Sequence, residues 1–214
     1  MKKDLEQRSY LFDIRAESGE TGSIITGMPI VYNSRTDLGW FDEIIESGAL
    51  NGTDLTDVRF LVNHDLSKVP LARSRRNNGN STMQLTVDER GMSIRVSLDT
   101  ENNADAKALY SAVQRRDITG MSFMFSVDGE AWDNLESEHP TRRIQKIGSV
   151  VEVSACTFPA YDATEINARS KTALDNARSA LDKARSSDAD LLDRRNKELE
   201  LLKEKTKILG GYYA

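Results

Sequence analysis

The sequence is poor in the residues from which metal centres and disulfides are usually built. Its 214 residues include one cysteine, Cys156, and two histidines, His64 and His139. A single cysteine excludes an intramolecular disulfide and any cysteine-rich zinc module, and it is typical of a reducing compartment. Two histidines also limit histidine-based metal sites. The sequence therefore indicates no metal and no organic cofactor.

Long apolar runs and an excess of basic charge are missing too. No stretch approaches the ~20 apolar residues of a membrane span, and no apolar run follows Met1-Lys2-Lys3 as it would in a secretory leader. The 29 basic and 34 acidic residues give a net charge of −5, so no general positive field is available to hold nucleic acid. We expect a soluble cytoplasmic protein that binds neither nucleic acid nor a membrane.

Glycine, proline and aromatic residues are absent from Glu165 to Leu209, which divides the chain in two. This segment consists mainly of alanine, leucine and charged residues, a composition that favours helix. Ser170 to Leu209 carries ten basic and eight acidic residues, so the negative excess belongs to the front of the chain. We expect a domain over residues 1–164 and a helical tail over 165–214, with the helix ending at Gly210-Gly211.

The tail carries a narrow apolar seam. Its apolar residues recur at heptad-like spacing, with a one-residue slip after Ser186-Ser187-Asp188. The sequence leaves three alternatives open: a helix docked on its own domain, a coiled-coil tether to a partner or second copy, and a disordered segment. The seam residues are Leu174, Ala177, Leu181, Ala184, Leu191, Leu192, Leu199, Leu202 and Leu209.

The front part is dominated by short β-rich runs separated by turn residues. One helix is expected from Asn103 to Arg115, and Asp88-Glu89-Arg90-Gly91 predicts a hairpin turn. This pattern favours a mostly β barrel or sandwich that carries helices, an α+β fold. The predicted strands are Tyr10–Ile14, Ser23–Tyr32, Val58–His64, Val69–Ser74, Thr82–Val87, Met92–Leu98, Gly120–Val127, Arg143–Ile147 and Val150–Thr157.

Three of these runs place a reactive side chain among apolar ones. Ser122 alternates with Met121, Phe123 and Phe125, so it points away from the aromatic face of its strand. His64 ends the run that begins at Val58. Glu152 lies inside an apolar run, where a carboxylate is costly unless it is paired. Together they supply the nucleophile, imidazole and carboxylate that an activated serine needs.

Each residue also has a simpler interpretation. His64 alone could be a core histidine, and Glu152 could form an ion pair with Arg143 or Lys146. Cys156 is a rival nucleophile, but its sequence neighbours offer no cation to lower the pKa of its thiol, which favours a buried apolar role. Asp65 is an alternative third member, although it should face away from His64 if the strand continues. His139, in a turn-rich loop, is expected to be exposed.

The three runs, in this order, resemble the prohead (capsid maturation) proteases of tailed bacteriophages. They are Phe60-Leu61-Val62-Asn63-His64-Asp65, Ile118-Thr119-Gly120-Met121-Ser122-Phe123-Met124-Phe125 and Val151-Glu152-Val153-Ser154-Ala155-Cys156-Thr157-Phe158-Pro159-Ala160. Residues 27–33 and 41–49 look like the family's opening strands, and the likeness spans residues 8–165. That family is related to the herpesvirus assemblin proteases, which implies a β barrel surrounded by helices.

The resemblance implies a role for each residue. Ser122 would be the nucleophile, His64 the general base and then general acid, and Glu152 would orient His64 where the herpesvirus enzymes use a third histidine. Those enzymes build the oxyanion hole with an arginine pair, and the matching positions here are Ala160 and Tyr161. The backbone N–H of Ala160 is then the candidate oxyanion donor, because Pro159 has no N–H.

The resemblance also implies a function. Family members cleave the scaffold protein, or the scaffold-like segment of the major capsid protein, and commonly themselves, inside the assembling prohead in the bacterial host cytoplasm. Capsid or scaffold protein would be the partner, the tail would be a tether, and Ser186-Ser187 is a candidate self-cleavage region. Self-association into a dimer stays open. The alternatives are an inactive capsid assembly or scaffolding protein and an unrelated β-domain adaptor.

Overall fold

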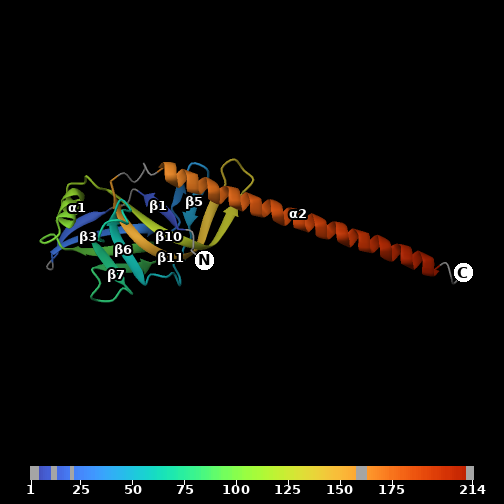
Figure 1. Ribbon diagram of the computed structural model, residues 1–214, viewed down its shortest axis with the longest axis horizontal. Coiled ribbons are helices and arrows are strands. Elements are labelled where there is room, and N and C mark those ends of the chain that lie inside the picture. The colour runs from blue at the N-terminus through green and yellow to red at the C-terminus, as the bar shows by residue number, and fades with distance from the viewer. Residues whose placement is uncertain (1–4, 11–13, 20–21, 158–162, 211–214) are drawn as a thin grey trace. The chain divides into compact units, whose positions relative to one another are not determined.

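The computed structural model describes residues 5–10, 14–19, 22–157 and 163–210 (Figure 1). By its internal contacts the chain divides into two units, Met1–Lys171 and Thr172–Ala214, and each is described by itself. The elements in chain order are β1 (Glu6–Tyr10), β2 (Arg15–Gly19), β3 (Gly22–Val31), β4 (Arg35–Asp37), β5 (Asp42–Ile45), β6 (Asp57–Val62), β7 (Ala72–Arg75), β8 (Met83–Asp88), β9 (Gly91–Leu98), α1 (Ala104–Gln114), β10 (Gly120–Asp133), β11 (Thr141–Cys156) and α2 (Ala163–Gly210).

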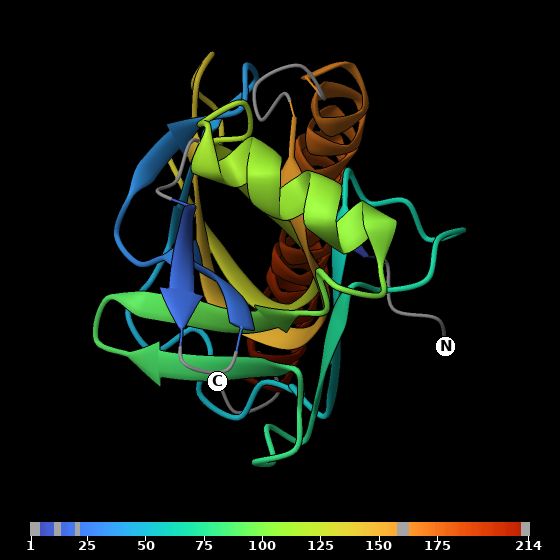
Figure 2. The ribbon, with the colours of Figure 1, turned by 90° about the vertical axis from the view of Figure 1, so that its left-hand side faces the viewer.

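The strands form two sheets. One has seven strands in the order β1-β10-β11-β5-β4, with β6 also paired to β11 and β7 to β6; the other has the order β2-β3-β9-β8. Helix α1 packs against β2, β3 and β9 and crosses in front of the strands (Figure 2). The prediction of a strand-rich α+β fold with a C-terminal helix is confirmed. The prediction of a barrel is wrong, because the described strands make two separate sheets that do not close into one.

Several local predictions agree with the structure. Helix α1 begins after Asn103, whose side chain accepts hydrogen bonds from the backbone N–H groups of Asp105 and Ala106. Strands β8 and β9 form the expected hairpin, with Asp88 opposite Gly91. Gly91 has φ of 140°, and a Cβ there would lie 2.0 Å from the carbonyl oxygen of Ile30. Glycine is therefore required at this turn.

Other strand boundaries differ from the prediction. Two predicted runs over residues 143–157 are one strand, β11, which pairs with β10 through several register shifts typical of β-bulges. At each bulge the alternation of apolar and polar residues is interrupted although the strand continues. The sequence pattern therefore shows two short runs where the structure has one long strand. The predicted run Tyr10–Ile14 falls mainly on residues 11–13, which lie outside the described residues; Tyr10 is the last residue of β1, and β2 begins at Arg15.

The core of the first unit lies between the two sheets and under α1. Met121, Phe123 and Phe125 of β10 are each fully buried in it, together with Phe60 of β6 and Val153 of β11. Because side chains alternate along a strand, the intervening Ser122 lies on the other face of β10. The aromatic core thus anchors the strands that carry the polar residues of the site.

Helix α2 carries the apolar seam of the tail. In its outer part Leu191, Leu192, Leu199 and Leu202 are between 49% and 65% exposed. No described helix is both long enough and apolar enough to cross a membrane.

Candidate active site

Three neighbouring strands align a row of serines. Ser9 of β1 lies opposite Ser122 of β10, and Ser122 lies opposite Ser154 of β11. Directly opposed residues share a face of the sheet, so the three hydroxyls lie on the face turned away from Phe123. Strand β6 then pairs with β11 in parallel, which brings the end of β6 beside this row.

His64 lies in a turn just beyond β6, and the expectation that it ends the strand is wrong. Asn63 and His64 have φ of 51° and 56°, the left-handed conformation, which turns the chain sharply after Val62. The Asn63 amide exchanges hydrogen bonds with Thr157, donating to its Oγ1 at 3.0 Å and accepting from its backbone N–H at 2.9 Å. The His64 backbone N–H donates to Ser154 Oγ at 3.1 Å. These contacts fix the turn and aim the imidazole at β10.

The structure brings Ser122, His64 and Glu152 into one hydrogen-bonded chain. His64 Nε2 lies 2.5 Å from Ser122 Oγ, and His64 Nδ1 is hydrogen-bonded to Glu152 Oε1. The other oxygen of Glu152 accepts from Ser154 Oγ at 2.7 Å. The side chains of His64 and Glu152 are only 8% and 1% exposed, and Ser122 is fully buried.

This arrangement can activate a hydroxyl. The imidazole has one nitrogen at Ser122 to take a proton, while its other nitrogen is held in place by a carboxylate, as in an activated serine. Because the carboxylate is buried and has little water to screen it, its attraction for a charged ring is stronger than at the surface. Ser154 satisfies the remaining carboxylate oxygen and so fixes the orientation of Glu152.

The structure also shows what is near the other residues that the sequence left as alternatives. Asp65 accepts hydrogen bonds from the backbone N–H and hydroxyl of Ser67, so its carboxylate is engaged within its own turn. Arg143 pairs with Glu46 at 2.7 Å rather than with Glu152. Cys156 is buried, as expected, but its Sγ lies 4.0 Å from His64 Nε2, much closer to the imidazole than its sequence neighbours suggested.

Strand β1 pairs with β10 directly beside the candidate nucleophile. The Ser122 hydroxyl donates to the carbonyl oxygen of Arg8 at 2.6 Å and accepts from Ser9 Oγ at 2.9 Å. The hydroxyl has one proton, so while it donates to Arg8 it does not donate to His64 Nε2. The hydroxyl must turn toward Nε2 before His64 can take its proton, and in this structure the site is occupied by a segment of its own chain.

A family model of the caudovirus prohead serine proteases matches residues 11–179. The chain belongs to the caudovirus prohead serine protease family. This prohead protease is accordingly a serine peptidase of capsid maturation. Among solved structures it is similar to the capsid assembly protease of bacteriophage T4, gp21, with 10% identity, a TM-score of 0.43, and coverage of 73% of this chain and 98% of that one. A search of the curated proteins gives no match.

Sequence reasoning missed several residues of the prohead protease site. Ser154 was not singled out, although alternation along the strand places it on the same face as Glu152, and that alternation is the signal that could have found it. Arg8 and Ser9 carried no signal, because nothing local indicates that an N-terminal strand pairs with β10 across more than 100 residues. The candidate oxyanion donor, Ala160, lies outside the described residues.

A groove opens beside the His64 turn of the prohead protease. Its volume is about 420 Å³, and its lining includes Asn63, Asp65 and Lys68 from the turn, Leu109 from α1, and Ile118. Strand β1 runs antiparallel to β10, with Tyr10 opposite Met121. An extended peptide continuing in that direction would approach Ile118, and therefore this groove.

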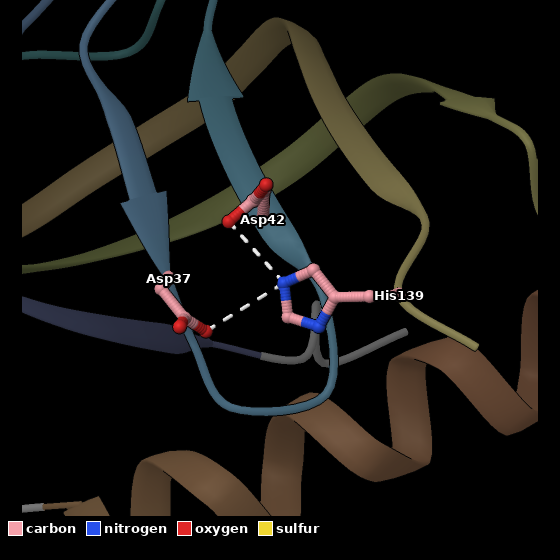
Figure 3. A group of neighbouring side chains, drawn as sticks. All are labelled: Asp37, Asp42 and His139. Atoms are coloured by element: carbon pink, nitrogen blue, oxygen red, sulfur yellow. Dashed lines mark hydrogen bonds and ion pairs between the residues drawn. The ribbon is translucent and has the colours of Figure 1, made fainter. Parts of the chain in front are cut away.

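His139 lies apart from these residues. It is exposed, as expected, and its Nε2 lies 3.3 Å from Asp42 Oδ1 and 3.7 Å from Asp37 Oδ1 (Figure 3). The three side chains could each turn one ligand atom to a metal ion. Arg35 already pairs with Asp42 at 2.8 Å, and the group is an ordinary surface ion-pair cluster, so we assign it no metal.

Proposed function

We propose that this prohead protease cleaves scaffold protein, or the scaffold-like segment of the major capsid protein, using Ser122, His64 and Glu152. The observation that supports these roles is the buried chain from Ser122 Oγ through both nitrogens of His64 to Glu152. Three side chains from three separate elements meet there, in the geometry by which a serine is activated. The reaction would take place inside the assembling prohead in the host cytoplasm.

In the proposed reaction Ser122 Oγ attacks the carbonyl carbon of the scissile peptide bond. His64 Nε2 takes the hydroxyl proton, and the Glu152 carboxylate stabilises the imidazolium that results. The C–N bond then breaks as His64 gives its proton to the leaving amine. Water next attacks the acyl ester and gives a proton to His64. The bond between the acyl carbon and Ser122 Oγ then breaks as His64 returns that proton to Oγ, which leaves a carboxylic acid product, ionised to a carboxylate, and a regenerated Ser122. The backbone N–H of Ala160 stays a predicted donor to the oxyanion.

The protease also cleaves itself in this proposal. Ser186 and Ser187 lie inside helix α2, so a cut there would require the helix to unwind first. Strand β1 is already extended, and its Arg8 carbonyl oxygen lies 2.6 Å from Ser122 Oγ. Because proteases bind substrates as extended chains, often as an added strand, β1 is the better candidate for the self-cleaved segment.

Coexpression with the cognate capsid and scaffold proteins tests this function. The wild-type protease should shorten at least one of them, and Ser122→Ala should fold equally well and leave both intact. Ser126→Ala is a matched control, since Ser126 is a buried serine on the same strand that is hydrogen-bonded to Ser149 rather than to His64. If wild-type protease leaves capsid and scaffold proteins uncut, the inactive assembly protein is the better interpretation.

A further inference from the structure

The side chain of Arg8 fills a pocket at the edge of the seven-stranded sheet. Because neighbouring residues alternate, Arg8 points away from Ser9 and Ser122, toward the face that carries Phe125. It is 2% exposed, and its guanidinium binds Glu43 through both Nε and Nη2, at 2.6 and 2.7 Å. The guanidinium also lies 5.6 Å from the centre of the Phe125 ring. Within its own strand the guanidinium also donates to Glu6 at 2.6 Å and to the carbonyl oxygen of Gln7 at 2.8 Å, so Glu43 and Phe125 bind an arginine whose remaining hydrogen bonds come from the strand that carries it.

Glu6, two residues earlier in β1, forms an ion pair with Arg142. Its carboxylate accepts two hydrogen bonds from Arg142, at 2.6 and 2.8 Å. Arg142 is 2% exposed and also donates to Glu43 at 3.1 Å and to Glu130 at 2.8 Å. Burial raises the pKa of Glu6, but the hydrogen bond from Arg142 and the charges of Arg8 and Arg142 outweigh it and lower the pKa to about 2.

The pocket and its occupant come from different parts of the chain. Glu43, Phe125 and Arg142 all lie within the matched residues 11–179, whereas Glu6 and Arg8 precede them. Strand β1 is an edge strand, paired only with β10 among the described strands. A separate peptide added at that edge could make the same backbone and side-chain contacts.

We infer that Glu43 and Arg142 select the substrate of this protease, so that it cuts after an arginine that has an acidic residue two positions before it. The inference rests on the proposed function, because the position of the cut is set by Ser122: in β1, the carbonyl on Ser122 belongs to Arg8. In β1 itself the bond broken joins the carbonyl carbon of Arg8 to the nitrogen of Ser9. Water is consumed, leaving a carboxylate on Arg8 and an amine on Ser9.

The chemistry of Glu43 explains the preference for arginine. Glu43 is 1% exposed, and a neutral residue in place of Arg8 would leave this buried carboxylate with Arg142 as its remaining partner. Lysine would restore the charge but not the two parallel hydrogen bonds, because its ammonium is a point charge. An acidic residue at the position of Arg8 would meet Glu43 directly and should be rejected.

The test measures cleavage of matched peptides by the full-length protease. One peptide has the sequence of residues 5–14, and three others carry Arg8→Lys, Arg8→Gln or Glu6→Gln. We expect a cut between Arg8 and Ser9, slowed about tenfold by lysine or by Glu6→Gln and at least about 100-fold by Arg8→Gln. The same substitutions in the full-length chain should slow the loss of its own residues 1–8 in the same order.

A second arm changes the pocket. Glu43→Gln should reduce the preference for the arginine peptide over the glutamine peptide to less than about tenfold. Glu46→Gln is the matched control, because Glu46 pairs with a different arginine, Arg143. It should keep the wild-type preference.

Two results would overturn the inference: cleavage of the Arg8→Lys and Arg8→Gln peptides as fast as the arginine peptide, or an unchanged preference in Glu43→Gln. If Glu43→Gln fails to fold, the peptide series on the wild-type protease decides alone. Failure of the proposed function looks different, because then Ser122→Ala would cut the peptides, or the capsid and scaffold proteins, as well as the wild type does.

Discussion

The two ring nitrogens of His64 have different roles: Nε2 faces Ser122, and Nδ1 is hydrogen-bonded to Glu152. The carboxylate holds Nδ1, so that Nε2 is directed at Ser122 Oγ. A structural ion pair would need only charge attraction, whereas a catalytic partner must also hold the correct tautomer of the ring. Replacing Glu152 by glutamine separates these roles, because glutamine keeps the size but loses the charge.

Glu152→Gln should therefore lower the turnover number about 10³–10⁴-fold while the protein stays folded. Steady-state kinetics on the peptide of residues 5–14, with a thermal melt as the folding check, measures both effects. Asp65→Asn should change the turnover number less than about threefold, because the Asp65 carboxylate bonds Ser67 instead of His64. Equal losses in the two variants would contradict the role given to Glu152.

The residues of the candidate site differ in how visible they are in the sequence. Ser122 and Glu152 stand out as polar side chains in strongly apolar strands. The placement of His64 depends on two consecutive residues with positive φ, which no hydrophobic alternation reveals. The contact between Arg8 and Ser122 depends on a long-range strand pairing, and such pairings are set by the whole fold rather than by local pattern.

Among the elements, β1 controls access to Ser122. It is held by backbone pairing with β10 and by the ion pairs of Glu6 and Arg8, and it leaves Ser122 fully buried. As long as β1 stays in place, no other peptide can pair with β10 at Ser122. Cutting between Arg8 and Ser9 would divide the strand and weaken its hold on the site.

Docking of β1 should depend on pH through Glu6. The carboxyl has its ordinary pKa of 4.5 when free and a pKa of about 2 when β1 is docked. Its contribution to docking is thus fully present above pH 4.5 and is lost as the pH falls from 4.5 toward 2. Amide hydrogen exchange of β1 in Ser122→Ala should rise over this range, relative to β9, after correction for intrinsic rates.

Glu6→Gln in the same Ser122→Ala background is the control for this effect. It should exchange faster in β1 already at pH 7 and show a smaller change on acidification. Protection of β1 that stays constant from pH 5 to 3 would contradict the part assigned to Glu6.

The sequence predicted elements best where local chemistry decides them. Helix α1 with its Asn103 cap, the β8–β9 hairpin at Gly91 and the long helix α2 all follow from short-range signals. Strands β10 and β11 exceed their predicted lengths because bulges interrupt their alternation. The strand pattern left a barrel and a sandwich both open, and the barrel implied by the family resemblance is not what the described strands form, because strand number alone does not determine whether a sheet closes.

At the scale of the whole molecule, the chain combines a strand-rich unit that carries the site with a helical unit of nearly balanced charge. The exposed leucines of α2 form a seam that suits a partner helix, from capsid protein, scaffold protein or a second copy. We propose that this seam tethers the protease during assembly. Catalysis and incorporation into the prohead should then be separable.

Leu192→Gln combined with Leu199→Gln should reduce incorporation of the protease into proheads at least about tenfold, because it makes the seam polar. Cleavage of the peptide of residues 5–14 should stay within about twofold of wild type. Immunoblots of purified proheads and peptide kinetics measure the two effects. Arg194→Gln with Lys197→Gln changes neighbouring polar residues and serves as the control. Normal incorporation of the leucine variant would contradict the tether.

Intact-mass spectrometry of the full-length protein over time tests most directly whether Ser122 is the nucleophile. The wild type and Cys156→Ala should lose residues 1–8, and Ser122→Ala should keep its full mass. Cys156 is the decisive comparison, because its thiol lies 4.0 Å from the same His64 nitrogen. Loss of residues 1–8 in Ser122→Ala, together with an intact Cys156→Ala, would contradict the assignment of Ser122.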